Sequence, residues 1–207
     1  MPLDNPRTMD LVPHQISGLD LAHYRTLLPL YHDEHGAFSR WAAFLPGGAD
    51  ALDELRNLDL YDLRHVAGDA GKDMTGWDSP RGQVSDDFVA MLAEALGEFV
   101  SGDATWTLLR WQGYKNDVPA RTTVNIHDLD YDQQEMDLVS ALASIKDLRM
   151  PEFMWCSTNQ FGWGSPLLPD WGVMTMKAEH YIRHFAPRGF ESFYVTPDAV
   201  MPDNLGD

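Results

Sequence analysis

The chain has 207 residues and a formal net charge of -17, from 32 acidic and 15 basic side chains. This length fits one ordinary domain, which can bury roughly 70% of the surface that the unfolded chain exposes. The acid excess argues against binding to DNA or RNA phosphates and to anionic membranes, which need clustered Lys and Arg. No apolar run approaches the ~20 residues of a membrane span, so we expect a soluble, cytoplasmic protein.

Two interpretations of the acidity stay open. Asp outnumbers Glu and Arg outnumbers Lys, whereas exposed helix positions favour Glu and Lys. The bias reflects either the composition of the source proteome or a surface that engages a basic protein partner. The acids are scattered over helix starts, turns and both termini, which favours the first interpretation.

The first half of the chain contains one strongly predicted helix. Its apolar residues between Asp86 and Val100 form a single stripe, and Ser85 is in place to cap its start. The other predictions here are an irregular lead-in over 1–18, a helix over 19–31, a short helix over 50–57 and a loop over 68–82.

The second half mixes strands and helices. Residues 104–114 and 121–127 are predicted as strands that can pair as a hairpin. A helix is predicted over 132–147, with Asp132 and Glu135 in an arrangement like a capping box. The remaining predictions are strands over 152–156, 171–176 and 190–195, a short helix over 177–185 and a tail over 197–207.

These elements follow one another without a βαβ rhythm, so the predicted fold class is α+β. We expect a single domain over 1–207, because no linker divides the chain. The predicted sheet is mixed or antiparallel, has about four to six strands and is packed by helices on one side.

One candidate metal site lies near the end of the chain. His180 and His184 have the spacing of two ligands on one face of a helix. A divalent metal would need a third ligand, which His127 or His32 could supply. Histidines spaced in this way on a polar helix also occur simply as solvent-facing side chains.

Two further titratable clusters have a metal-binding and a solvated interpretation. Asp128, Asp130 and Asp132 resemble the start of a calcium loop, but the Gly and Glu that an EF-hand needs are missing. The run from His32 to His35 places four titratable groups in one turn. Each cluster is also typical of a solvated turn.

Catalytic signatures are not found. Residues 68–72 are too short for a phosphate-binding loop, and 162–166 do not form a nucleophile elbow. Cys156 lies among apolar residues of a predicted strand, so we expect a buried, unreactive thiol.

The segment 150–172 combines aromatic residues with Gly and Pro. Aromatic side chains on irregular backbone can form a stacking surface for a ligand or partner, although the same residues can fill the core. The candidate binding residues are Trp155, Phe161, Trp163 and Trp171, with Trp111 and Tyr114 from the preceding strand.

Patterns over most of the chain resemble an uncharacterised bacterial family that is common in actinobacteria. The run from Trp111 to Tyr114 is similar to its W-D-G-Y/W strand end, although Gln112 replaces the acid. Residues 171–175 are similar to its W-x-V-x-T strand, and 191–198 to its closing E-A-x-x-V-x-P-D pattern. The resemblance implies a single α+β domain and no particular activity.

Three functional hypotheses remain. The first is an acidic binding protein without catalytic activity, of which an immunity or antitoxin protein is one kind. The second is a metal-dependent enzyme that uses His180 and His184. The third is a small-molecule binder with its site in the aromatic segment 150–172.

Overall fold

The fold is built on a large antiparallel sheet. The structure, a computed structural model, describes residues 7–16, 18, 20–32, 34–48, 60–78, 80–113, 122–167 and 169–201. Within them, eight strands form one sheet in the order β11-β1-β10-β9-β8-β5-β7-β6, and three short strands form a second sheet in the order β3-β2-β4. All strand pairs are antiparallel.

The elements follow the chain in this order. The strands are β1 (Leu21–Leu27), β2 (Leu30–His32), β3 (Ala37–Ser39), β4 (Trp77–Asp78), β5 (Trp106–Trp111), β6 (Thr122–Ile126), β7 (Leu129–Met136), β8 (Phe153–Cys156), β9 (Phe161–Gly164), β10 (Trp171–Lys177) and β11 (Ser192–Val195). The helices are α1 (Leu60–Asp69), α2 (Asp86–Gly97), α3 (Leu138–Asp147) and α4 (Ala178–His180), with 3-10 turns at Thr8–Leu11, Trp41–Ala43 and Ala186–Arg188 and a π turn at Tyr181–Phe185.

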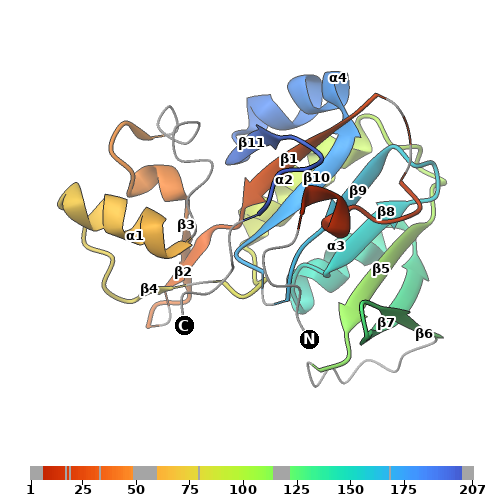
Figure 1. The fold of residues 1–207 in the computed structure, drawn as a ribbon, viewed down its shortest axis with the longest axis horizontal. Coiled ribbons are helices and arrows are strands. Elements are labelled where there is room, and N and C mark those ends of the chain that lie inside the picture. Colours follow the sequence, from red (N-terminus) through yellow and green to blue (C-terminus); the bar gives the residue numbers. More distant parts are fainter. Residues whose placement is uncertain are drawn as a thin grey trace.

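Helices α2 and α3 pack on one face of the large sheet, behind it in Figure 1. The predicted helix over 86–100 is confirmed, and the Ser85 hydroxyl accepts a hydrogen bond from the Phe88 amide at 3.1 Å. Its apolar stripe meets the alternate residues of the central strands, with Trp106 and Leu108 of β5 fully buried beneath it. This layer forms the largest core of the molecule.

The opposite face of the large sheet is covered by different segments. Figure 1 shows the smaller sheet and α1 beside one end of the large sheet, and the first 3-10 turn in front of it. A second core joins this end to the smaller sheet, through buried Trp41, Trp171 and Phe193. Helix α1 contributes Leu63 to this second core and packs with the smaller sheet, apart from α2 and α3.

The predicted α+β class is confirmed, but the sheet has more strands than the predicted four to six. The predicted helix over 19–31 is wrong, since this segment forms β1 and β2. β1 is a central strand with both faces buried, so its apolar residues do not alternate with polar ones. Its Arg25 is enclosed between the rings of Trp171 and Phe193, 5.1 and 5.6 Å from their centroids.

A second correction concerns the segment after β5. β6 does not pair with β5 but with β7, which lies between them in the sheet. The helix predicted over 132–147 begins only at Leu138, because Asp132 and Glu135 belong to β7. Asp137 caps the helix instead, and its carboxylate accepts the Ser140 amide at 2.7 Å. This backbone hydrogen bond lowers the pKa of the Asp137 carboxyl.

The remaining predictions have mixed outcomes. Strands over 104–114, 152–156, 171–176 and 190–195 and the helical segment 177–185 are confirmed in their main parts. The segment predicted as a loop over 68–82 also contains the short strand β4. The helix predicted over 50–57 lies outside the described residues. No helix among the residues that the structure describes is long and apolar enough to span a membrane.

Candidate functional site

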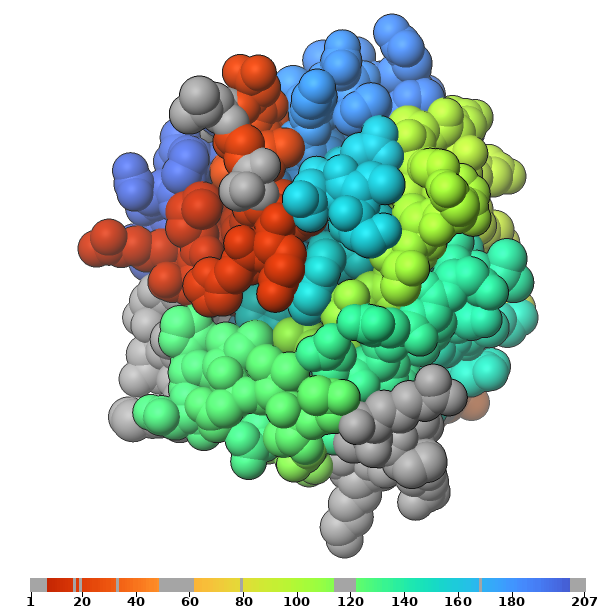
Figure 2. All heavy atoms as spheres, turned by 90° about the vertical axis from the view of Figure 1, so that its right-hand side faces the viewer, coloured from red at the N-terminus to blue at the C-terminus, as the bar shows by residue number. Residues whose placement is uncertain are grey.

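A groove runs along one border of the large sheet, on the face opposite α2 and α3. We call it the edge groove; its volume is about 360 Å³. In Figure 2 the N-terminal segment, in red, lies beside the green β6–β7 hairpin on this face of the molecule. The lining residues are Asp10, Val12, Pro13, His14, Gln15, Leu109, Val124, Asn125, Ile126, His127, Gln133, Phe153 and Trp155.

The floor of the edge groove is apolar. Leu109 of β5 lies opposite Phe153 of β8, and Trp155 follows two residues later on the same face. These three side chains belong to one buried cluster with residues of the N-terminal segment. An apolar floor with a few polar groups around it, at this volume, is typical of a binding site.

The first wall is the N-terminal segment, and two glycines of β9 let it lie directly on the sheet. A Cβ on Gly164 would lie 1.5 Å from the carbonyl oxygen of Leu11, and one on Gly162 would lie 2.8 Å from Ile16. Neither glycine has a positive φ, so the close approach of the two backbones is what requires them. This packing fixes residues 10–16 as a wall of the groove.

The second wall is the outer border of β6. Residues 124 to 127 all line the groove, although they are consecutive in the chain. Successive side chains of a strand point to opposite faces, so the groove meets the backbone of β6 as well as the side chains of one of its faces. β6 is the last strand of the sheet in this direction.

The hairpin behind this wall is strongly acidic. Residues 122–136 form what we call the acidic hairpin; it contains no Lys or Arg. Asp130 accepts a hydrogen bond from Asn125, and Asp132 accepts one from Gln112, both at 2.8 Å. Among the residues that the structure describes, none forms an ion pair with the hairpin acids. These acids are Asp128, Asp130, Asp132 and Glu135.

A larger cleft of about 500 Å³ lies between β3 and the start of α2. Two of its charged groups already have partners in the protein. Asp86 forms an ion pair with Lys146 at 2.9 Å, and Arg40 contacts the sulfur of Met91 at 3.2 Å. The edge groove is the better candidate, because it combines an apolar floor with a few polar groups and lies beside the acidic hairpin.

The aromatic segment 150–172 does not form an irregular surface, because it folds into β8, β9 and the start of β10. Phe161, Trp163 and Trp171 are fully buried, and the Trp163 ring nitrogen donates to the carbonyl of Pro151 at 2.9 Å. Trp155 is the member of the predicted set that lines the edge groove. Trp111 packs at the margin of the same cluster, half-buried, and Tyr114 lies outside the described residues.

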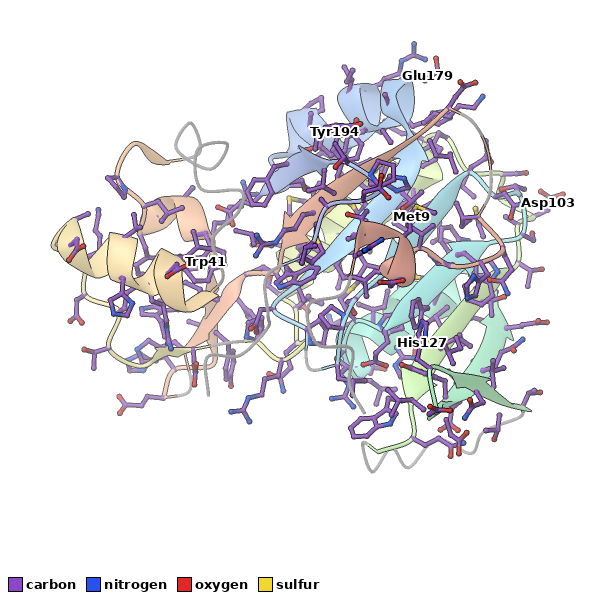
Figure 3. The ribbon with its side chains drawn as sticks, in the orientation of Figure 1. Met9, Trp41, Asp103, His127, Glu179 and Tyr194 are labelled. Carbon is purple, nitrogen blue, oxygen red and sulfur yellow. The ribbon has the colours of Figure 1, made fainter. Side chains whose placement is uncertain are left out.

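The three histidines of the predicted metal site lie in different surroundings. His180 and His184 both stack on Phe99, and the His184 ring is 2.6 Å from the Glu98 carboxylate. His127 lies at the turn of the acidic hairpin, far from the labelled Glu179 in Figure 3. Within the described ranges, no three His, Cys, Asp or Glu side chains gather in a way that could hold a metal ion.

The structure also shows where the two other titratable clusters of the sequence lie. Asp128 lies in the turn of the acidic hairpin, and Asp130 and Asp132 lie in β7, so they form no calcium loop. His32 and His35 stack with centroids 4.5 Å apart, and His32 meets the edge of Trp77. Cys156 is buried, as predicted.

Several charged side chains are buried, although residues of these types usually lie at the surface. Glu152 accepts the Trp111 amide at 2.8 Å, and burial lowers the pKa of Arg110 to about 10. Burial also raises the pKa of the Asp170 carboxyl to about 8, and the nearby Asp78 carboxylate adds to that shift. Glu191 accepts the amides of Trp41 and Ala42, at 2.9 and 2.6 Å. These groups join segments that are distant in the chain.

Sequence patterns did not reveal the edge groove. Val12, Leu109 and Val124 come from three distant segments, and nothing in their local sequence marks them as neighbours. The N-terminal segment was predicted to be irregular, and its role as a wall follows from the glycines of β9. Comparisons of the chain with protein-family models, curated proteins and solved structures give no match.

Proposed function

We propose that this protein is a binding protein whose partner is a positively charged polypeptide, and that the partner docks at the edge groove. The observation that carries the proposal is the acidic hairpin, which forms one side of the groove and whose carboxylates have no ion-pair partner among the described residues. Immunity and antitoxin proteins that neutralise a basic toxin are binders of this kind.

Electrostatics supports this choice of partner. The net charge of -17 attracts a cationic protein at long range and repels an anionic one. Complementary charge of this kind mainly raises the rate of association and selects the partner, while an apolar contact holds the complex. The edge groove provides such a contact through Leu109, Phe153 and Trp155.

A small-molecule ligand is a second candidate, which the position of Trp155 in the floor of the groove favours. A metabolite that stacks there would change the tryptophan fluorescence, and Trp155→Phe would remove that change. Unchanged fluorescence across a broad metabolite screen would argue against this candidate.

The main proposal is tested with a defined cationic peptide. An oligolysine peptide of about ten residues is titrated by calorimetry at about 0.05 M and about 0.5 M salt, with oligoglutamate as the negative control. We expect binding of oligolysine only, weakening steeply with salt. In the double variant Asp130→Asn/Asp132→Asn, the affinity at low salt should fall by about tenfold.

A matched control removes the same charge elsewhere. Asp103 and Glu179 are exposed and lie away from the acidic hairpin in Figure 3. Asp103→Asn/Glu179→Gln should reduce the affinity by about twofold or less, through long-range charge alone. Equal losses in the two double variants would refute a partner site at the hairpin.

A further inference from the structure

We propose that the partner binds as an added β-strand: an extended segment that alternates apolar and basic residues pairs with the outer edge of β6 inside the edge groove. This inference rests on the proposed function and specifies the binding mode and the chemistry of the partner. It is carried by the backbone of β6, by the two faces of the acidic hairpin and by an edge that no described strand pairs with.

The turn of the acidic hairpin shows which backbone groups of β6 point away from β7. His127 and Asp128 have φ values of 50° and 62°, and they connect the directly paired residues Ile126 and Leu129. A two-residue turn of this kind is flanked by a hydrogen-bonded pair, and such pairs alternate along an antiparallel ladder. The amides and carbonyls of Asn125 and Thr123 therefore point away from β7.

These outward groups are available for pairing. β6 is at the end of the sheet order, and no other strand among the described residues pairs with it. Natural edges are commonly guarded by Lys, Pro or bulges, but the sequence of β6 is Thr-Thr-Val-Asn-Ile and contains none of these residues. Strand addition at an open edge is a recurrent mode of peptide recognition.

The two faces of the hairpin determine the chemistry of the added strand. Val124 and Ile126 point to the side of the groove floor, where Leu109, Phe153 and Trp155 lie. Alternate residues of the added strand would share this side, so they should be apolar.

The remaining residues of the added strand would share the other face, with Asn125, Asp130 and Asp132. β7 is two strand spacings, about 10 Å, from the added strand. The long side chains of Lys and Arg can cover most of that distance and bring their charge close to the carboxylates. The partner segment should therefore carry basic residues at these alternate positions.

A second copy of this chain does not meet that requirement. It would bring its own net charge of -17, and pairing of two β6 edges would place two acidic hairpins side by side. Like charges across a strand pair are unfavourable. The charge pattern therefore selects a cationic segment.

The test compares three peptides of about nine residues, long enough to cover the edge. The first alternates Lys and Val, the second has the same composition in separate Lys and Val blocks, and the third is the alternating peptide with N-methyl groups on the amides that would face β6. Calorimetry should show the alternating peptide binding at least tenfold more tightly than the block peptide, and about thirtyfold more tightly than the N-methylated one. N-methylation of the amides on the opposite edge of the peptide should have little effect.

A protein variant tests the same edge. Asn125→Pro removes an amide that points outward, a position at which an edge strand tolerates Pro. The alternating peptide should lose at least tenfold in affinity, while circular dichroism and thermal unfolding show that the variant is folded. If the variant fails to fold, the two N-methylated peptides still test the pairing on the unaltered protein.

The outcomes separate the two proposals. Equal, salt-sensitive binding of the alternating and block peptides would overturn strand addition and leave the cationic partner in place. No binding of any cationic peptide at low salt would overturn both. Self-association of the protein that Asn125→Pro abolishes would also overturn the inference, because a second copy would then occupy the edge.

Discussion

Gly164 is the residue on which the wall of the edge groove depends most directly. Its α-carbon faces the backbone of Leu11, and a Cβ there would lie 1.5 Å from the Leu11 carbonyl oxygen. Gly164→Ala should therefore displace residues 10–16 and lower the free energy of unfolding by about 3 kcal/mol. Urea denaturation measures this change.

The matched control is the same substitution at Gly97 in α2, where a Cβ would meet nothing within 4 Å. Gly97→Ala should raise the free energy of unfolding by about 0.5 to 1 kcal/mol, because Ala favours the helix. Similar effects of the two substitutions would refute the close approach between β9 and the N-terminal segment.

Asp170 makes the stability dependent on pH. Burial raises the pKa of its carboxyl to about 8 in the folded chain; the Asp78 carboxylate adds to this shift, and Arg64 and Arg81 oppose it. Between the ordinary pKa near 3.8 and about 8, the unfolded chain releases this proton while the folded chain keeps it. Stability should therefore fall as the pH rises through this window, by up to about 1.4 kcal/mol per pH unit.

Asp170→Asn should remove this part of the pH dependence. The difference in unfolding free energy between variant and wild type should grow in favour of the variant from pH 4 to pH 8 and then stay constant, because both states of the wild type are ionised above that pH. A difference that does not change with pH would show that Asp170 ionises normally in the folded chain.

At the scale of single elements, the turn of the acidic hairpin holds two consecutive non-glycine residues in the left-handed region. Asp128 has a φ of 62°, in the left-handed region where Gly is preferred. Asp128→Gly should raise the free energy of unfolding by about 1 kcal/mol. Asp128→Asn removes the same charge and should change stability by less than about 0.5 kcal/mol. A destabilising Asp128→Gly would contradict the turn geometry.

The local sequence predicts an element well when only one face of that element is buried and when a capping residue marks its end. α2 has its apolar stripe and its capping Ser85, so it was predicted with nearly correct ends. β1 was predicted as a helix because it is buried on both faces and carries no alternation. Asp132 was placed at a helix start because Asp is common there, while pairing with β5 extended the strand through it.

At the scale of the whole molecule, the order of the strands could not be predicted. The floor and walls of the edge groove bring together residues near positions 12, 109, 125 and 154, and tertiary packing alone makes them neighbours. The charge of -17 was visible in the sequence. Its scatter along the chain favoured a general surface bias. The fold adds that the local run Asp128, Asp130 and Asp132 lies on the hairpin at the end of the sheet.

Hydrogen–deuterium exchange of the backbone amides in complex with the peptide that alternates Lys and Val tests the central claim most directly. The amides of Thr123 and Asn125 point away from β7 and should exchange fast in the free protein. On binding, their exchange should slow by at least tenfold, because the added strand accepts their hydrogen bonds. Binding that leaves both amides unprotected, or that protects only residues elsewhere, would contradict the account.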